Sequence, residues 1–257
     1  MSTTNLSGRV VLMFVGASAG MGAATAQEFA EHELESNIRR KHPSVEIHIA
    51  AVDIRNKNEI DNAVNSLPEK FKRVDVLVNN AGIAVGFNTI EKQTQEDILS
   101  VLETNLNGLI YMTHAILPRM KERNSGDIIN IGSISGKQTH QYGNSIYSAS
   151  KYAVEGFTTS IRKELIATKI RVILIRPGAV KTEFTLRRSG DDDKFDAIFY
   201  EGYDPLVAKD IAECVVFAAI RPTNVVISEM EVLSNAQADI MLIHREGGDG
   251  PLAKKKI

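Results

Sequence analysis

Short, almost entirely apolar runs alternate along the chain with longer stretches in which apolar residues recur every three or four positions. The amphipathic stretches predict helices at residues 21–40, 56–66, 94–120, 148–168 and 207–220. The apolar runs predict strands at residues 10–15, 45–52, 74–78, 127–131, 170–175 and 225–233. This alternation is typical of βαβ units on a parallel sheet, and the continuous apolar character of most runs indicates strands buried on both faces.

The pattern predicts one α/β domain over residues 1–257, with no internal repeat and no linker. A chain of 257 residues that is 43% hydrophobic can bury a sizeable core. The pattern breaks down at residues 187–205, where charges, glycines and a proline predict a loose segment on the substrate side. Within it, the acidic triplet at residues 191–193 reads as a solvated turn.

Composition narrows the classes of partner. The formal net charge of -2 gives no basic excess for nucleic acid. No apolar run approaches the roughly 18 residues of a membrane span, and the start of the chain lacks the layout of a signal peptide, so we expect a cytoplasmic protein. The single Cys214 fits a reducing compartment, and the scattered histidines predict no metal site.

A glycine-rich turn, "VGASAGMG", follows the first predicted strand and opens a helix. Gly16, Gly20 and Gly22 permit a tight turn and close approach of the backbone to a ligand, and Ser18 adds a hydroxyl. A helix N-terminus at this point would face the pyrophosphate of a dinucleotide. Taken alone, the turn is equally compatible with an ordinary strand-to-helix connection.

Tyr147 and Lys151 stand four positions apart on a predicted helix and therefore share one face. A phenol is a poor base at neutral pH, but a nearby ammonium lowers its pKa and makes proton exchange with an alcohol feasible. Ser133, at the end of the strand before, can hold a substrate oxygen beside that phenol. A bare tyrosine and lysine at this spacing are more often a surface pair.

The order of these elements along the chain decides between the two interpretations. The glycine turn, "NNAG" (79–82), "TN" (104–105), Ser133, the tyrosine–lysine pair and "RPGAVKTEF" (176–184) follow one another, each at its expected strand end or helix. Together they resemble the short-chain dehydrogenase/reductase family over nearly the whole chain. Longer stretches such as "FKRVDVLVNNAGIAVG" resemble its NADP-dependent 3-hydroxy acid dehydrogenases, which oxidise serine, allo-threonine and related acids.

The resemblance implies a single-domain Rossmann-like doubly wound parallel sheet and a role for each matching residue. Tyr147 would be the general acid or base, Ser133 would orient the substrate oxygen, and Lys151 would lower the tyrosine pKa and bind the nicotinamide ribose. Asn105 would hold a water that links Lys151 to solvent. The other implied cofactor contacts are Gly16, Ser18, Gly20 and Gly22 at the pyrophosphate, Asp53 and Ile54 at the adenine, Asn79, Ala81 and Gly82 at the adenosine ribose, and Pro177, Gly178, Val180 and Thr182 at the nicotinamide.

The chain departs from the family between Phe29 and Leu34, where the usual second strand and its basic turn are absent. Either the strand at 45–52 moves in beside 10–15, or it keeps its place and leaves a gap. A gap would leave backbone donors and acceptors unpaired, so we favour the shift. The shift would put Asp53 at a strand tip, where a carboxylate favours NAD. The resemblance implies NADP, but NAD stays possible because the segment that usually binds the 2′-phosphate is absent. Arg39, Arg40 and Lys41 do not restore a 2′-phosphate site, because they lie at the wrong end of their helix.

Arg187 and Arg188, just past "TEFTL", are candidate cations for the carboxylate of a substrate. We expect Arg176 to have a structural role and His140 to lie on the surface of a loop. The loop from Ser133 to Tyr147 is one residue longer than in near relatives. We therefore predict an oxidoreductase that transfers a hydride between NADP(H) and a 3-hydroxy acid, in a homodimer or homotetramer. The alternatives are a catalytically impaired or silent isoform that acts as an oligomer partner, and an enzyme for a ketone, aldehyde or sugar alcohol.

Overall fold

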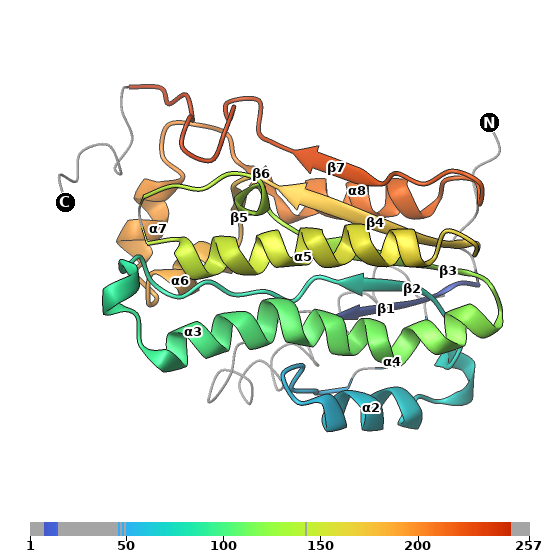
Figure 1. Ribbon diagram of the computed structural model, residues 1–257. Coiled ribbons are helices and arrows are strands. Elements are labelled where there is room, and N and C mark those ends of the chain that lie inside the picture. Colours follow the sequence, from blue (N-terminus) through green and yellow to red (C-terminus); the bar gives the residue numbers. More distant parts are fainter. Residues whose placement is uncertain (1–7, 15–45, 47, 49, 142, 248–257) are drawn as a thin grey trace.

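The computed structural model describes residues 8–14, 46, 48, 50–141 and 143–247. Its main sheet is parallel, with the strand order β1-β2-β3-β4-β7 (Figure 1). The strands are β1 (Val10–Phe14), β2 (Val74–Asn79), β3 (Gly126–Ile131), β4 (Ile170–Pro177) and β7 (Glu229–Val232). Every residue of β2 and β3 is buried, as the unbroken apolar runs predict.

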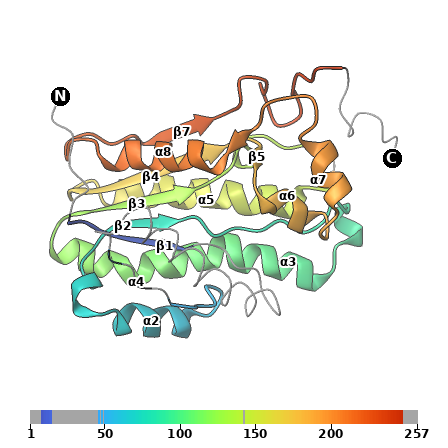
Figure 2. The same ribbon diagram turned by 180° about the vertical axis from the view of Figure 1, so that it is seen from behind.

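Helices cover both faces of this sheet. On one face lie α2 (Lys57–Ser66), α3 (Gln95–Leu102), α4 (Gly108–Glu122) and α5 (Ser145–Glu164), and on the other lies α8 (Ala208–Ala219), as the two opposite views show (Figures 1 and 2). The core on the first face centres on Met112, Ile116 and Ile128, and the core on the second on Ile129, Ile173 and Ile211. This three-layer arrangement confirms the predicted α/β, doubly wound fold.

The helix predicted at 94–120 is interrupted. Between α3 and α4 the backbone forms a π-helical turn, η3 (Glu103–Asn107), which widens the helix at Asn105. Such single π turns often mark functional sites, and the pattern of apolar and polar positions did not predict this one. Short 3₁₀ turns occur at η1 (Glu69–Phe71), η2 (Ile90–Lys92) and η4 (Ile134–Gly136).

The prediction of a strand at 45–52 is wrong for the part of it that the structure describes. Residues 46, 48 and 50–52 belong to no strand, and 46, 48, 50 and 51 are exposed. Instead, Glu46 pairs with Lys70, and the His48 ring stacks on Phe71 at 5.9 Å. Contacts with the η1 turn hold this segment there, so the shift beside β1 that we favoured is not found among the described residues. The strand predicted at 225–233 is likewise shorter, because only residues 229–232 pair with β4.

The segment at 187–205 is more ordered than its composition indicates. It contains the end of α6 (Glu183–Arg188) and the whole of α7 (Asp193–Phe199). The acidic triplet is exposed, as predicted, but only part of it is a turn: Asp191 has a positive φ of 62°, Asp192 caps α7 by accepting from the backbone N–H groups of Lys194 and Phe195, and Asp193 is already the first residue of α7. A two-stranded ribbon of β5 (Val180–Lys181) and β6 (Leu206–Val207) lies beside these helices, beyond the carboxyl end of β4 (Figure 1).

A buried ion cluster joins the amino ends of the strands. The Asp127 carboxylate accepts two hydrogen bonds from Arg171, at 2.6 and 2.7 Å, and one from Arg9 at 2.7 Å. Removing one member of a buried ion pair leaves an uncompensated charge. We therefore expect Asp127→Asn to lower the free energy of unfolding by about 3 kcal/mol, measured by urea denaturation. Asp61→Asn breaks only a half-exposed pair with Lys57 and should cost less than about 0.5 kcal/mol; equal losses in the two variants would contradict this prediction.

Candidate active site

The glycine turn with Gly16, Ser18, Gly20 and Gly22 lies outside the described residues, as do the predicted helix at 21–40 and the basic group at 39–41. The remaining predicted site residues are described. They gather at the carboxyl ends of β2, β3 and β4, near the first turn of α5 (Figure 1). That edge is where open α/β sheets bind their ligands.

Tyr147 and Lys151 share one face of α5, as their spacing predicts. The Lys151 Nζ atom lies 5.8 Å from the centre of the Tyr147 ring and donates a hydrogen bond of 2.9 Å to the carbonyl of Ile131. Lys151 is only 4% exposed, so its ammonium has left bulk water. Ser133, at the end of β3, hydrogen-bonds the tyrosine hydroxyl, and its own Oγ accepts from the backbone N–H of Ser135 at 3.0 Å.

Burial moves both pKa values toward the neutral forms. It raises the pKa of Tyr147, while the hydrogen bond with Ser133 and the charge of Arg188 act in the opposite direction. Burial also lowers the pKa of Lys151 to about 8. At neutral pH the phenol therefore keeps its proton and the lysine is mostly charged, which suits a proton donor next to a cation.

Asn105 connects the π turn to the chain that follows β2. Its Oδ1 accepts from the N–H of Ile83 at 2.7 Å, and its Nδ2 donates to the Ile83 carbonyl at 2.9 Å and to Ser150 Oγ at 3.0 Å. Gly82 faces the same place: a Cβ there would lie 3.4 Å from Lys151 Nζ and 3.5 Å from Asn105 Oδ1. The missing side chain of Gly82 thus leaves space in front of the lysine, where a ribose hydroxyl or a water fits.

Three predicted cofactor contacts line one small hollow. Ile54, Asn79 and Ala81 surround it together with α4 residues such as Gly108. The Asn79 side chain points into the sheet, where its Nδ2 donates to Asn130 Oδ1 at 2.8 Å and to Thr113 Oγ1 at 3.2 Å. Its Oδ1 atom is buried and has no hydrogen-bond partner among the residues that the structure describes. Most of the other lining residues are apolar, including Ile54, Leu109 and Met112, and such a lining suits a flat apolar group.

Asp53 is not at a strand tip, because residues 50–52 form no strand. Its carboxylate makes a bidentate pair with Arg55, at 2.9 Å from Nε to Oδ1 and 2.6 Å from Nη2 to Oδ2. Hydrogen bonding to this guanidinium lowers the pKa of Asp53. Asp53 therefore does not occupy the strand-tip position from which we expected it to contact the adenosine ribose, and the structural argument for NAD no longer holds.

The predicted nicotinamide contacts form a strip that runs from the end of β4 into α6. Gly178 donates from its N–H to the Val232 carbonyl at 2.8 Å, Val180 belongs to β5, and Thr182 caps α6 by accepting from the N–H of Phe184 at 3.3 Å. Pro177 is the last residue of β4. The strip thus follows directly from β4, the strand next to β3, and Ser133 lies two residues beyond the end of β3.

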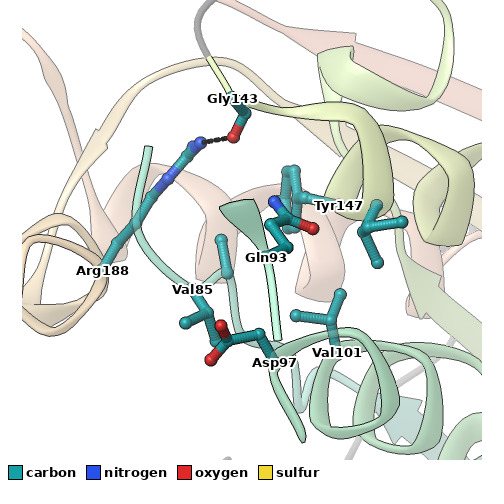
Figure 3. Close-up of a pocket in the computed structure, with 9 residues that line it drawn as sticks. Val85, Gln93, Asp97, Val101, Gly143, Tyr147 and Arg188 are labelled. Carbon is teal, nitrogen blue, oxygen red and sulfur yellow. Dashed lines mark hydrogen bonds between the residues drawn. The ribbon is translucent and has the colours of Figure 1, made fainter. Parts of the chain in front are cut away.

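The two candidate substrate arginines lie in different environments. Arg187 is exposed and pairs with Glu183, four residues earlier on α6, at 2.7 Å. Arg188 instead points into the site and stacks 4.3 Å over the Phe87 ring, with the Tyr147 ring centre at 6.0 Å. It donates from Nε to the Gly86 carbonyl at 3.0 Å and from Nη2 to the Gly143 carbonyl at 3.1 Å (Figure 3).

Arg188 is a cation that has lost much of its contact with water. It forms no ion pair with any carboxylate in the part of the chain that the structure describes, and burial lowers its pKa to about 10. Tyr147, Arg188, Gln93 and Asp97 line one pocket with about 230 Å³ of empty space open to solvent (Figure 3). A desolvated cation is unfavourable unless an anion neutralises it. The pocket therefore suits a small anionic molecule.

The loop from Ser133 to Tyr147 keeps the two hydroxyls in hydrogen-bond contact, and its greater length than in near relatives stays a prediction. Gly143 has a positive φ of 55°, and a Cβ there would lie 2.1 Å from the Phe87 carbonyl oxygen, so the loop packs tightly where only glycine fits. His140 is half-buried rather than at the surface, contrary to the prediction, and burial lowers its pKa to about 4. Arg176 is structural, as predicted, because it pairs with Glu155 and Glu229.

Sequence reasoning missed several polar residues of this region. Gln93 and Asp97 enter the pocket from the start of α3, while Tyr200 and Gln237 reach the strip from segments near the carboxyl end of the chain. No periodic or spacing signal marks them, because each reaches the site through a loop or helix end whose position depends on distant contacts.

Comparison with known proteins settles the family. A family model described as short chain dehydrogenase matches residues 10–193. The chain belongs to that family. It is 38% identical over 250 residues to an NADP-dependent 3-hydroxy acid dehydrogenase of Salmonella typhi, covering 92% of this chain and all of the relative. A protein of the same name from Schizosaccharomyces pombe is 35% identical over 260 residues, which cover 95% of this chain and 99% of the relative.

This short-chain dehydrogenase is also similar to a relative with a different name and to several solved structures. Sulfoacetaldehyde reductase 2 of Chromohalobacter salexigens is 34% identical over 241 residues, covering 89% of this chain and 95% of the relative. Among solved structures, the closed form of serine dehydrogenase complexed with NADP⁺ superposes with a TM-score of 0.79 at 33% identity, covering 92% of this chain and the whole of that one. The predictions of family and of an oxidoreductase are confirmed, and the alternative of a silent isoform is not favoured.

Proposed function

We propose that this enzyme transfers a hydride between NADP(H) and the hydroxyl or carbonyl carbon of a small 3-hydroxy acid of the serine or allo-threonine type. The observation that carries the proposal is Arg188, a desolvated cation beside Tyr147 that lacks a carboxylate partner among the described residues. A substrate carboxylate on the guanidinium would place the carbon two bonds away, which bears the hydroxyl, toward the tyrosine. The names of the relatives support the same class of substrate.

Each catalytic residue then has one task. The Tyr147 hydroxyl gives its proton to the oxygen of the carbonyl substrate, or takes it back from the alcohol, while Ser133 holds that oxygen. The Lys151 ammonium stabilises the phenolate that forms. Asn105 and Gly82 border the space through which a water can resupply the proton. NADP(H), when bound, supplies or accepts the hydride.

The described residues leave room for such a cofactor. Gly82 leaves space beside Lys151, and the apolar hollow at Ile54 and Ala81 suits an adenosine. NADP rather than NAD is supported by the names of the relatives and by the pairing of Asp53 with Arg55. We propose that Lys151 holds the nicotinamide ribose and that Pro177, Gly178, Val180 and Thr182 hold the nicotinamide.

Asp97 adds a negative group to the same pocket. Its Oδ2 accepts from the Thr94 N–H at 3.1 Å, and the carboxylate lies across the pocket from Arg188 (Figure 3). A zwitterion such as serine would meet a cation at one side and an anion at the other. On this ground we rank amino acids with a 3-hydroxyl above simple hydroxy acids.

Replacing Arg188 with glutamine tests the proposal. We expect kcat/KM for 3-hydroxypropionate to fall about 100-fold, because a charge-assisted pair with the carboxylate is lost. With methyl 3-hydroxypropionate, which has no carboxylate, the same variant should lose no more than about threefold. Initial rates of NADPH formation measure both. Equal losses with acid and ester would mean that Arg188 only anchors the loops at Gly86 and Gly143.

A second anion is compatible with the site, since a sulfonate pairs with a guanidinium as a carboxylate does. The sulfoacetaldehyde reductase among the relatives favours including it. Sulfoacetaldehyde and the semialdehydes of 3-hydroxy acids can be compared directly in the reductive direction. An unchanged preference for uncharged ketones, aldehydes or sugar alcohols over both anions would contradict the proposed class.

The cellular location and the assembly stay predictions. In the part of the chain that the structure describes, no helix is long and apolar enough to cross a membrane. The resemblance implies a homodimer or homotetramer, and the composition predicts a cytoplasmic protein.

A further inference from the structure

Gln237 reaches the strip at 177–182 from a distant part of the chain. It lies in the segment after β7, which turns back over β5 and β6 (Figure 1). The side chain is only 6% exposed although no helix or strand of the main sheet contains it. A glutamine loses much rotational freedom when buried in this way, so its contacts must compensate for that cost.

The carboxamide of Gln237 is held at both ends. Its Oε1 accepts from the backbone N–H of Ala179 at 2.9 Å, and its Nε2 donates to the Asp239 carbonyl at 3.2 Å. The backbone N–H of Gln237 donates to the Ser234 carbonyl at 2.9 Å. Because the side chain is anchored on its own segment, it fixes the position of Ala179 rather than following it.

Gly178 shows how closely the strip approaches this carboxamide. A Cβ at Gly178 would lie 2.2 Å from Gln237 Oε1 and 2.9 Å from Leu233 Cδ2. Such distances exclude any side chain unless Gln237 moves and gives up its bond to Ala179. The glycine at 178 and the glutamine at 237 therefore form one packing unit.

Two further backbone groups of the strip form hydrogen bonds with neighbouring segments. The Gly178 N–H donates to the Val232 carbonyl, and the Val180 carbonyl accepts from the Tyr200 hydroxyl at 2.7 Å. Thr185 Oγ1 lies 2.7 Å from the same hydroxyl, so Tyr200 is itself oriented. Contacts on one side thus determine the path of the backbone from Gly178 to Val180.

We propose that Gln237 is a positioning residue for the nicotinamide end of NADP, acting through the backbone at 178–180. This inference rests on the proposed placement of the nicotinamide along the strip. Loss of the Gln237 contact frees Ala179 and lets the strip move, so the ring is bound less tightly while the adenosine end of the cofactor is unaffected. Precise placement of that ring relative to Tyr147 is what the hydride transfer needs.

The test compares a whole cofactor with a fragment of it. In Gln237→Leu, we expect the Kd of NADPH to rise about tenfold, as for the loss of one buried hydrogen bond, while the Kd of 2′-phospho-ADP-ribose, which lacks the nicotinamide, stays within about twofold of the wild-type value. Reduced-nicotinamide fluorescence measures the first Kd, with low background because the chain has no tryptophan, and displacement of NADPH measures the second.

Two further variants separate positioning from general damage. Gly178→Ala should show the same split between the two ligands, because its methyl group displaces the Gln237 carboxamide, and it serves if Gln237→Leu does not fold. Gln138→Leu is the matched control, since Gln138 Oε1 accepts from the N–H of Ile240 at 2.9 Å in the same segment and, among the described residues, has no side-chain hydrogen bond to the strip. It should weaken neither ligand more than about twofold.

The outcomes are distinguishable. Equal weakening of NADPH and the fragment in Gln237→Leu and Gly178→Ala, or no weakening of either, would overturn the role of Gln237. If the wild-type protein binds NADPH no more tightly than the fragment, the placement of the nicotinamide along the strip is wrong, and the inference about Gln237 is lost with it.

Discussion

Replacement of Tyr147 with phenylalanine should lower kcat about 1,000-fold and leave the Kd of NADPH within about twofold of the wild-type value. The variant keeps the aromatic ring and its contact with Phe184 at 5.7 Å, so it removes only the hydroxyl that Ser133 contacts. General acid–base catalysis contributes typically 10²- to 10⁴-fold, and no other hydroxyl or acid of the described site stands in the same place on α5.

The matched control is Tyr152→Phe. Tyr152 lies on the same helix but is 44% exposed, so its replacement should leave kcat within about twofold of the wild-type value. Single-turnover measurements with bound NADPH would separate the chemical step from product release. Turnover of Tyr147→Phe at more than about a tenth of the wild-type rate would refute the proposed acid.

Replacement of Lys151 with methionine should lower kcat of carbonyl reduction about 100-fold and abolish its pH dependence near pH 8. Burial lowers the pKa of Lys151 to about 8, so the ammonium is present below that pH and absent above it. Only the charged form stabilises the phenolate that appears when Tyr147 gives up its proton. In the wild-type enzyme the rate of reduction should therefore be constant at low pH and fall as the pH rises through about 8.

The same argument gives the control for this second variant. Lys163 lies on α5 at an exposed position, so Lys163→Met should change neither kcat nor the pH profile. Methionine at 151 also loses the hydrogen bond to the Ile131 carbonyl, and a thermal melt shows whether the variant is folded at the assay temperature. A pH profile of Lys151→Met that still falls near pH 8 would assign the titration to another group.

Much of the fold followed from local pattern. The strands at 74–79, 126–131 and 170–177 and the helices at 57–66 and 208–219 lie within a few residues of their predicted places, because each is decided by apolar residues a few positions apart. The pairing of Tyr147 with Lys151 followed in the same way, since four residues make about one helical turn. The order of motifs along the chain then identified the family before any distance was known.

Local pattern was insufficient wherever a distant contact competes with it. The alternation at 45–52 indicates a strand, yet Glu46 and His48 pair with the η1 turn, some 20 residues later. Helical periodicity continues through the π turn at 103–107, which is stabilised by the bonds of Asn105 to Ile83. In both places the deciding interaction lies outside the window in which a periodic pattern can be detected.

The two arginines at the substrate end show which features depend on the sequence alone and which depend on the tertiary structure. By itself, the sequence determined the sheet, its helices, the family and the tyrosine–lysine pair, because these depend on spacing within one element and on the order of elements. It could not distinguish Arg187 from Arg188, which are identical in kind and adjacent in the chain. Only the tertiary structure decided that Arg187 meets Glu183 and water while Arg188 lies over Phe87 beside Tyr147, because successive residues of a helix point about 100° apart and packing selects which of them faces the site.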